Sequence, residues 1–328
     1  MHAPHGCGGD ENMKRLFEVM WNAVFTLQGR ANVSNRWRLF LAGRSPEWRR
    51  GNPMPFRLKN GRRFVAHRGN ALSNLIYANG AYEPLESELA AAILREGDTF
   101  IDIGANIGYF TAIGSEAVGQ TGGVHAFEPG GATFAALSKT IGALGLRNVT
   151  ARNAAVAESS GMVDFWVSDS GRDAQQGMLR TGGLCGDCHS VGVEAVRLDD
   201  YVRTWNFERR STLRLVKCDV EGAEVRVLRG AGGILALDSA PVWLIEHNRA
   251  ALREHGFSSE DLCEFFRSHV VFYIPLAWPP SIRSVAHALP MPSAAALPDE
   301  CNLLAIPQEG TNSECLAQLR RAGLLAPE

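Results

Sequence analysis

The sequence predicts a Rossmann-like α/β fold, with a mostly parallel sheet flanked by helices. From residue 99 onward, short apolar runs alternate with stretches of helical periodicity, which is typical of βαβ units. A glycine-containing turn, Asp102-Ile103-Gly104-Ala105-Asn106-Ile107-Gly108, lies between the first of these strands and the next helix. Such a turn lets a ligand approach the backbone closely, so we expect a binding site there.

The predicted elements follow in a regular order. A helix begins near Pro84, which suits a first helical position, and ends at Gly97. Strands are predicted at residues 99–103, 124–127, 149–156, 213–218 and 242–245, with a late strand at 302–306. Helices are predicted at residues 108–118, 132–144 and 314–325, with one more through Val225, Leu228 and Leu235.

Three segments break this rhythm. Residues 1–80 are Arg-rich and irregular, with an expected amphipathic helix at 13–27 and a hairpin around Asn60-Gly61. Residues 168–190 have little periodicity and are interpreted as a mobile loop over a site. Residues 281–298 form an Ala/Pro/Ser connector.

Composition limits the function classes. The 328 residues carry a formal net charge of -2, which disfavours a nucleic-acid acceptor because phosphate binding needs a basic excess. Seven cysteines, an odd number, argue against a secreted disulfide framework, so we expect a reducing, cytoplasmic location. No run approaches the ~18 apolar residues of a membrane span.

The chemistry of the turn favours one nucleoside over another. Asn106 replaces the second glycine of the dinucleotide fingerprint, and Asp102 precedes the first. A carboxylate would repel a pyrophosphate but attract the ammonium or sulfonium of S-adenosylmethionine. Glu128, after the second strand, can accept hydrogen bonds from ribose hydroxyls. The alternatives are that the glycines only make a turn, and that Glu128 only begins a helix before Pro129.

With these residues in view, the sequence resembles the FkbM-type S-adenosylmethionine-dependent methyltransferases. The resemblance covers about residues 82–247, with a weaker echo at 302–307. Its motifs are Phe100-Ile101-Asp102-Ile103-Gly104-Ala105-Asn106-Ile107-Gly108-Tyr109-Phe110, Ala126-Phe127-Glu128-Pro129, Asn153-Ala154-Ala155-Val156, Val196-Arg197-Leu198-Asp199 and Lys217-Cys218-Asp219-Val220-Glu221-Gly222-Ala223-Glu224.

The resemblance implies a class I methyltransferase fold, S-adenosylmethionine as cofactor, and mostly O-methylation of small-molecule or glycan acceptors. Residues 81–308 would then be the methyltransferase domain, preceded by an accessory region (1–80) and followed by a C-terminal helix (309–328). Residues 1–80 and the 168–190 loop match the family less well, and we expect them to set the acceptor. The family pattern puts cofactor contacts on Asp102, Gly104, Asn106, Gly108 and Glu128, and also on Glu83 and Asn153.

Three residues are candidates for catalysis. Lys217 and Asp219 share a face of the fourth strand and lie near its carboxyl end, where parallel sheets bind ligands. We expect Asp219 to act as base or orienter, with Lys217 holding its carboxylate; the alternative is that Asp219 caps the next helix. Glu246 and His247 end the fifth strand, and His247 is a second candidate for proton transfer.

A methyltransferase is therefore the first functional hypothesis. The others are an NAD-dependent oxidoreductase on a similar sheet and a non-catalytic nucleoside-binding protein. No metal ligands are assigned, and metal dependence stays open, because Asp219 and Glu246 could contribute oxygen ligands to a divalent ion although nothing in their spacing requires one. The sequence does not indicate the acceptor or the oligomeric state.

Overall fold

The computed structural model describes residues 52–168, 188–205, 212–276 and 286–327. The chain divides into two compact units, Met1–Gly80 and Ala81–Glu328. The helix expected at 13–27 and most of the loop expected at 168–190 lie outside the described residues.

The described part of the first unit is a hairpin with one helix. Strands β1 (Met54–Arg57) and β2 (Arg63–Ala66) pair antiparallel, and the intervening turn has Gly61 at φ 83°. Helix α4 (Ala71–Asn79) begins at an Asn70 cap and packs Tyr77 against the hairpin. The hairpin predicted around Asn60-Gly61 is confirmed.

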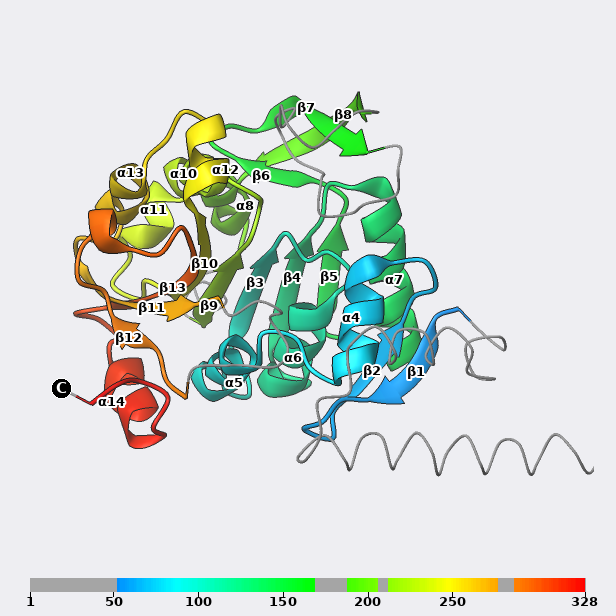
Figure 1. The fold of residues 1–328 in the computed structure, drawn as a ribbon, viewed down its shortest axis with the longest axis horizontal. Helices are drawn as coiled ribbons and strands as arrows, with labels where there is room; N and C mark the ends of the chain where they lie inside the picture. Colours follow the sequence, from blue (N-terminus) through cyan, green and yellow to red (C-terminus); the bar gives the residue numbers. More distant parts are fainter. Residues whose placement is uncertain (1–51, 169–187, 206–211, 277–285, 328) are drawn as a thin grey trace, which may run out of the picture. The chain divides into compact units, whose positions relative to one another are not determined.

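The second unit is built on an eight-stranded sheet (Figure 1). Five of its strands are parallel, and they lie in the order β5-β4-β3-β9-β10. Their bounds are β3 Thr99–Ile103, β4 Gly123–Phe127, β5 Val149–Arg152, β9 Leu213–Cys218 and β10 Val242–Asn248. Strand order reverses between β3 and β9, and this switch point is where open α/β sheets bind ligands.

Three further strands extend the sheet beyond β10. They are β13 (Glu300–Pro307), β11 (His269–Pro275) and β12 (Leu289–Pro290), and each runs antiparallel to its neighbour. The last long strand along the chain is thus inserted between two earlier ones. This mostly parallel sheet confirms the class I methyltransferase fold.

Helices cover both faces of the sheet. Asp102 and Lys217 belong to the face covered by α5 (Pro84–Ile93), α6 (Tyr109–Val118) and α7 (Gly131–Leu144). Gly114 of α6 packs directly on the Phe100 ring, where a Cβ would lie 2.2 Å from a ring carbon. The opposite face forms an extensive apolar core with five short helices, which are α8 Leu198–Arg203, α10 Glu224–Arg229, α11 Gly232–Leu235, α12 Arg249–Glu254 and α13 Ser259–Glu264.

Some predicted elements differ from the structure. The single strand expected at 149–156 is two strands, because Asn153 turns the chain out of the main sheet. Its second half, β6 (Ala155–Ala157), joins β7 (Gly161–Ser168) and β8 (Cys188–Arg197) in a separate sheet. The helix expected through Val225 and Leu235 breaks into α10 and α11 at Gly230, whose backbone touches the Ala157 carbonyl too closely for a side chain.

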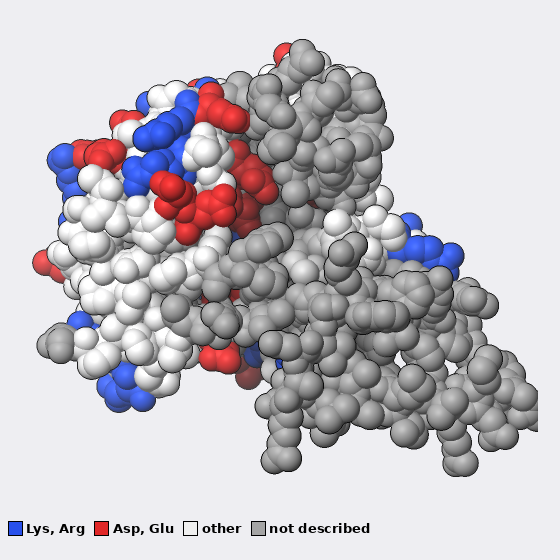
Figure 2. Space-filling model, viewed as in Figure 1, with Lys and Arg blue, Asp and Glu red and all other residues white. Residues whose placement is uncertain are grey.

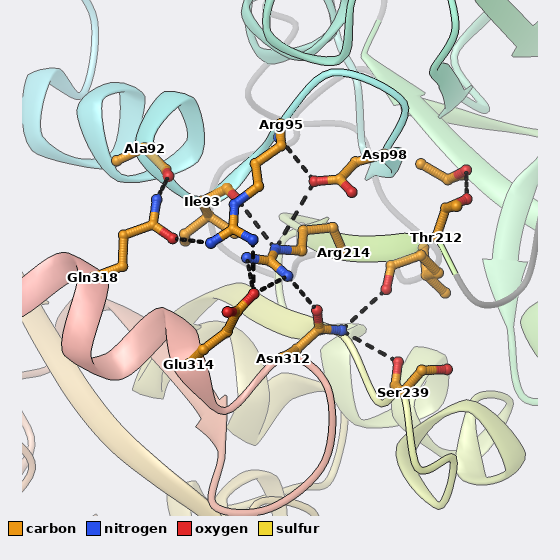
Figure 3. A network of polar contacts seen from close by, with 12 residues as sticks. Ala92, Ile93, Arg95, Asp98, Thr212, Arg214, Ser239, Asn312, Glu314 and Gln318 are labelled. Carbon is orange, nitrogen blue, oxygen red and sulfur yellow. Dashed lines mark hydrogen bonds and ion pairs between the residues drawn. The ribbon is translucent and has the colours of Figure 1, made fainter.

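The amino ends of the central strands are tied to the C-terminal helix α14 (Glu314–Arg321) by a polar network (Figure 3). Arg214 of β9 donates to Asn312 at 2.9 Å and to Glu314 at 3.1 Å. Arg95 donates to Glu314 at 2.7 Å and to Gln318 at 2.6 Å. We call these residues, with Asp98, the amino-edge network.

The described surface mixes both signs of charge. Over the region of α10, α12 and α13, basic side chains are interleaved with acidic ones (Figure 2), including Arg226 and Arg229 beside Glu158. None of the helices that the structure describes combines the length and apolar composition needed to cross a membrane.

Candidate active site

The turn after β3 approaches the segment after β9 very closely. Gly104 has φ 78°, and a Cβ on it would lie 1.8 Å from the carbonyl oxygen of Asp219. Gly108 (φ 87°) precedes α6, and a side chain there would meet Leu137. Only glycine therefore fits at position 104, and the turn and Asp219 lie side by side at the switch point of the sheet.

Asp102 lies under this turn with one oxygen free of protein donors. Its side chain is 1% exposed; Oδ2 accepts a hydrogen bond from Thr111 at 2.6 Å, whereas Oδ1 has no partner. Burial raises the pKa of Asp102, while the Lys217 charge opposes that rise. A buried acceptor without a donor is costly, so this oxygen suits a cationic or hydrogen-bonding ligand.

Glu128 organises the next part of the site. Its Oε2 accepts from the Asn106 backbone at 2.9 Å, and Oε1 accepts from Gly130 and Thr133 at the start of α7. Asn153 donates to the carbonyls of Glu128 and Pro129. The expected role at the start of a helix is thus present. The same carboxylate also fixes the turn that contains Gly104 and Asn106, and its remaining lone pairs stay available.

A lysine and an aspartate form the ion pair at the end of β9. Lys217, 5% exposed, pairs in register with Asp102, and its Nζ donates to Asp219 Oδ2 at 2.7 Å. The ammonium also lies 4.6 Å from the centre of the Phe110 ring. Burial lowers the pKa of Lys217, whereas the nearby carboxylates of Asp219, Glu83 and Asp102 raise it. The carboxylates have the larger effect, so the pKa lies well above its usual value. Lys217 is therefore a permanent cation.

Asp219 does not cap the helix that follows it. The Glu224 side chain accepts from the backbone N–H groups of Val220 and Gly222 instead, at 3.0 and 3.2 Å. The Asp219 side chain stays 27% exposed. Its carboxylate is held by Lys217 and is still accessible to a ligand.

Glu83 adds to the site a second carboxylate with an unpartnered oxygen. It precedes α5 in a left-handed conformation (φ 42°), and its buried Oε2 has no hydrogen-bond partner. Burial raises the pKa of Glu83 to about 8, although the Lys217 charge opposes the rise. A left-handed backbone conformation stores strain in a residue other than glycine. Among the described residues, the non-glycine residues in this conformation are Glu83, Asn106 and Glu221, and all three lie at this edge of the sheet.

Glu246 and His247 point to opposite faces of β10, as the period of a strand requires. Leu244 pairs with Lys217, so Glu246 shares the face of the ion pair. His247 is fully buried on the other face, where Nε2 contacts Ser259 at 2.7 Å, and burial lowers its pKa. A catalytic role for His247 stays a prediction, and its contacts favour a structural one.

The unpartnered oxygens of this site fit S-adenosylmethionine as a ligand. Three buried oxygens lack partners near the Gly104 turn, on Glu83, Asp102 and Asn106. An ammonium, a sulfonium and ribose hydroxyls would supply the positive charge and the donors that these oxygens lack. Within the described ranges no cluster of three His, Cys, Asp or Glu side chains is arranged to hold a metal ion.

The fold and these acceptor oxygens define an α/β nucleoside-binding methyltransferase. The family model described as the methyltransferase FkbM domain matches residues 102–271, just over half of the chain. The chain belongs to the FkbM methyltransferase family, and its cofactor is S-adenosylmethionine. This assignment replaces the NAD-dependent alternative.

Solved structures from several organisms match part of the chain. An FkbM methyltransferase from Methylobacillus flagellatus is 14% identical, with 71% of this chain and 52% of that chain covered and a TM-score of 0.37. Fibrillarin from Aeropyrum pernix with bound S-adenosyl-L-methionine is 14% identical over 77% and 93% of the two chains, with a TM-score of 0.39. A putative rRNA methylase from Clostridium thermocellum is 14% identical over 70% and 96%, with a TM-score of 0.40. No curated protein matches the chain.

Sequence reasoning missed two features of the site. The Glu86 carboxylate accepts from Asn302 at 3.0 Å, which ties α5 to β13 behind Glu83. The ring of Phe110 lies beside the Lys217 ammonium, a contact for which we had no expectation. Neither contact has a signature in the local sequence, because each joins residues that are far apart along the chain.

Proposed function

We propose that this methyltransferase transfers the methyl group of S-adenosylmethionine to a hydroxyl oxygen of a small acceptor, such as a natural product or a glycan. The observation that supports this is the Lys217–Asp219 pair, a buried cation bonded at 2.7 Å to a carboxylate that stays accessible. A hydroxyl must be oriented and must lose its proton, and a fixed carboxylate can help with both.

In this proposal the residues divide into two groups. Asp102, Gly104, Asn106, Gly108 and Glu128 hold the cofactor, with Glu83 contributing charge and Asn153 fixing the Glu128 segment. When bound, the cofactor supplies an electrophilic methyl group. Asp219 accepts a hydrogen bond from the acceptor hydroxyl, and Lys217 keeps the Asp219 carboxylate in one position.

The test is methyl transfer to oxygen. The protein is incubated with S-adenosylmethionine labelled with ¹³C in its methyl group and a panel of alcohols, phenols and methyl glycosides. We expect a new O–CH₃ signal by NMR, and a rate about 10² to 10⁴ lower in Asp219→Asn. Asp164→Asn, on an exposed position of β7, is the matched control. Label found on nitrogen or carbon would contradict O-methylation.

We further propose that residues 81–308 form the catalytic domain, with 1–80 as an accessory region and 309–328 as a C-terminal helix. The family match at 102–271 lies inside the central part. Limited proteolysis should first release a fragment that begins near residue 81 and still binds S-adenosylmethionine. Loss of binding in that fragment would contradict the division.

A further inference from the structure

Glu246 is a carboxylate at the active-site edge for which the proposed function has no role. We propose that Glu246 takes the proton from the acceptor hydroxyl, while Asp219, held by Lys217, orients that hydroxyl. This inference rests on the proposed function and separates two roles that were both open for Asp219.

The sheet places Glu246 beside the ion pair. Strands β9 and β10 are parallel, with Leu244 opposite Lys217 and Ile245 opposite Cys218. Glu246 is the next residue along β10, so it lies beside Asp219 and, by the strand period, on the same face as Lys217. On its other side Glu246 pairs through the backbone with Asn302 of β13. The position is therefore fixed by strands on both sides.

Glu246 has a buried oxygen without a donor, as Glu83, Asp102 and Glu224 also do. Its Oε2 has no hydrogen-bond partner, although the side chain as a whole is partly exposed. By contrast, Asp219 is bonded to Lys217, and Glu86 is bonded to Asn302. Glu224 uses one oxygen for two backbone N–H groups. Glu246 therefore combines an oxygen without a protein donor with a strand position beside Asp219.

The charges around Glu246 make its carboxylate basic. Burial raises its pKa well above the usual value, and the carboxylates of Asp219, Glu221 and Glu224 raise it further. Lys217 is the cation that opposes this rise, and it is already bonded to Asp219. Other titratable groups that interact with Glu246 are Tyr82, Cys218 and Cys301. A base whose pKa lies nearer the working pH is the more effective proton acceptor.

The proposed reaction moves one proton to Glu246 and one methyl group to the acceptor oxygen. The acceptor O–H bond breaks, and its proton passes to the Glu246 carboxylate. The oxygen forms a bond to the methyl carbon as the carbon–sulfur bond breaks, with its electron pair remaining on sulfur. The products are the methyl ether, S-adenosylhomocysteine and a protonated Glu246, which then releases its proton to water.

The kinetic test compares three variants in the ¹³C-methyl assay across pH 5–10. Glu246→Gln should lower the rate by about 10² or more and abolish the rise of rate with pH, because that rise follows ionisation of Glu246. Glu246→Asp should keep the rise at a reduced rate. Glu309→Gln, which removes an exposed glutamate outside the site, should stay within about 3-fold of wild type. A Glu246→Gln variant with the wild-type pH profile would overturn the proposal.

A second measurement needs no acceptor. In protein labelled with ¹³C at the glutamate carboxyl carbons, the signal that disappears in Glu246→Gln should titrate at a midpoint well above that of an ordinary glutamate. A midpoint near the ordinary glutamate value of about 4.3 would overturn the inference whatever the acceptor. Calorimetric titration with S-adenosylmethionine should give similar affinities for wild type and Glu246→Gln. If methyl transfer goes to an atom other than oxygen, the proposed function fails independently of this result.

Discussion

The two edges of the central sheet use charged residues in opposite ways. At the amino ends of the strands, Arg214 is 6% exposed in its side chain and contacts Asn312, Glu314 and the Ile93 carbonyl (Figure 3). At the carboxyl ends, buried oxygens of Glu83, Asp102, Asn106, Glu224 and Glu246 have no partner.

This difference distinguishes charged residues that stabilise the fold from polar oxygens that are available to a ligand. A buried polar group stabilises the fold when it is matched and costs free energy when it is not. The amino-edge network is matched within the protein, so its role is to join α14 to the sheet. The unmatched oxygens of the carboxyl edge are explained by a ligand that supplies what they lack.

The largest effect on stability is expected at the amino edge. Arg214→Met leaves Asp98 and Glu314 without their buried cation, and should lower the free energy of unfolding by about 2–3 kcal/mol, less than for a fully buried pair because Glu314 is 52% exposed. Urea denaturation measures the loss. Affinity for S-adenosylmethionine should be unchanged, and a tenfold loss of affinity would mean that the two edges are not independent.

A sharper comparison uses the two aspartates at the ends of β3. Asp102→Asn removes the charge that faces the cofactor site and should weaken S-adenosylmethionine binding about tenfold, or about 1.4 kcal/mol, without lowering stability. Asp98→Asn, in the amino-edge network, should leave binding unchanged. Calorimetry on both variants measures the difference, and equal effects would contradict the assignment of Asp102 to the cofactor.

The smallest effect concerns pH. The pKa of Glu83 is about 8 in the fold, so between about pH 4.5 and 8 the folded state holds a proton that the unfolded state has released. Stability should therefore fall as pH rises through this range. Glu83→Gln should flatten that slope and stabilise the protein at pH 8.5 by on the order of 1 kcal/mol. Unfolding curves at several pH values measure it.

Glu314 provides the opposite case at the amino edge. Hydrogen bonds from Arg214 and Arg95 hold the pKa of Glu314 below its usual value. Its contribution is present above the unfolded pKa and is lost as pH falls, so Glu314→Gln should lower stability by a constant amount at neutral and higher pH and should remove the loss on the acid side. Unfolding curves that coincide with those of wild type at pH 7 would contradict the comparison.

The sequence predicted the parallel strands well because each is a short apolar run with its own turn residues. The strands at Thr99–Ile103 and Leu213–Cys218 have the expected bounds. It did not predict that residues 149–156 divide between two sheets, because only two residues, neither of them glycine or proline, separate Val149–Arg152 from Ala155–Ala157. Which sheet a strand joins depends on neighbours that are distant along the chain, such as the pairing of Ala155 with Ala195.

The candidate site shows the same division. Local motifs located Asp102, Gly104 and Asp219, because a turn after a strand has a recognisable composition. The opposite orientations of Glu246 and His247 follow from the strand period once the register of β10 with β9 is known. The unpartnered oxygens could not be predicted at all, since the absence of a donor depends on every residue packed nearby.

The position of β13 has a consequence for how the chain is made. During synthesis, β10 and β11 both emerge before residues 300–307 exist, yet each pairs with β13 and not with the other. Until that strand arrives, a nascent chain holds two unpaired strand edges, which are sites of aggregation. A chain cut short before residue 300 should therefore need a chaperone to stay in solution, even though every cofactor-binding motif has already been translated.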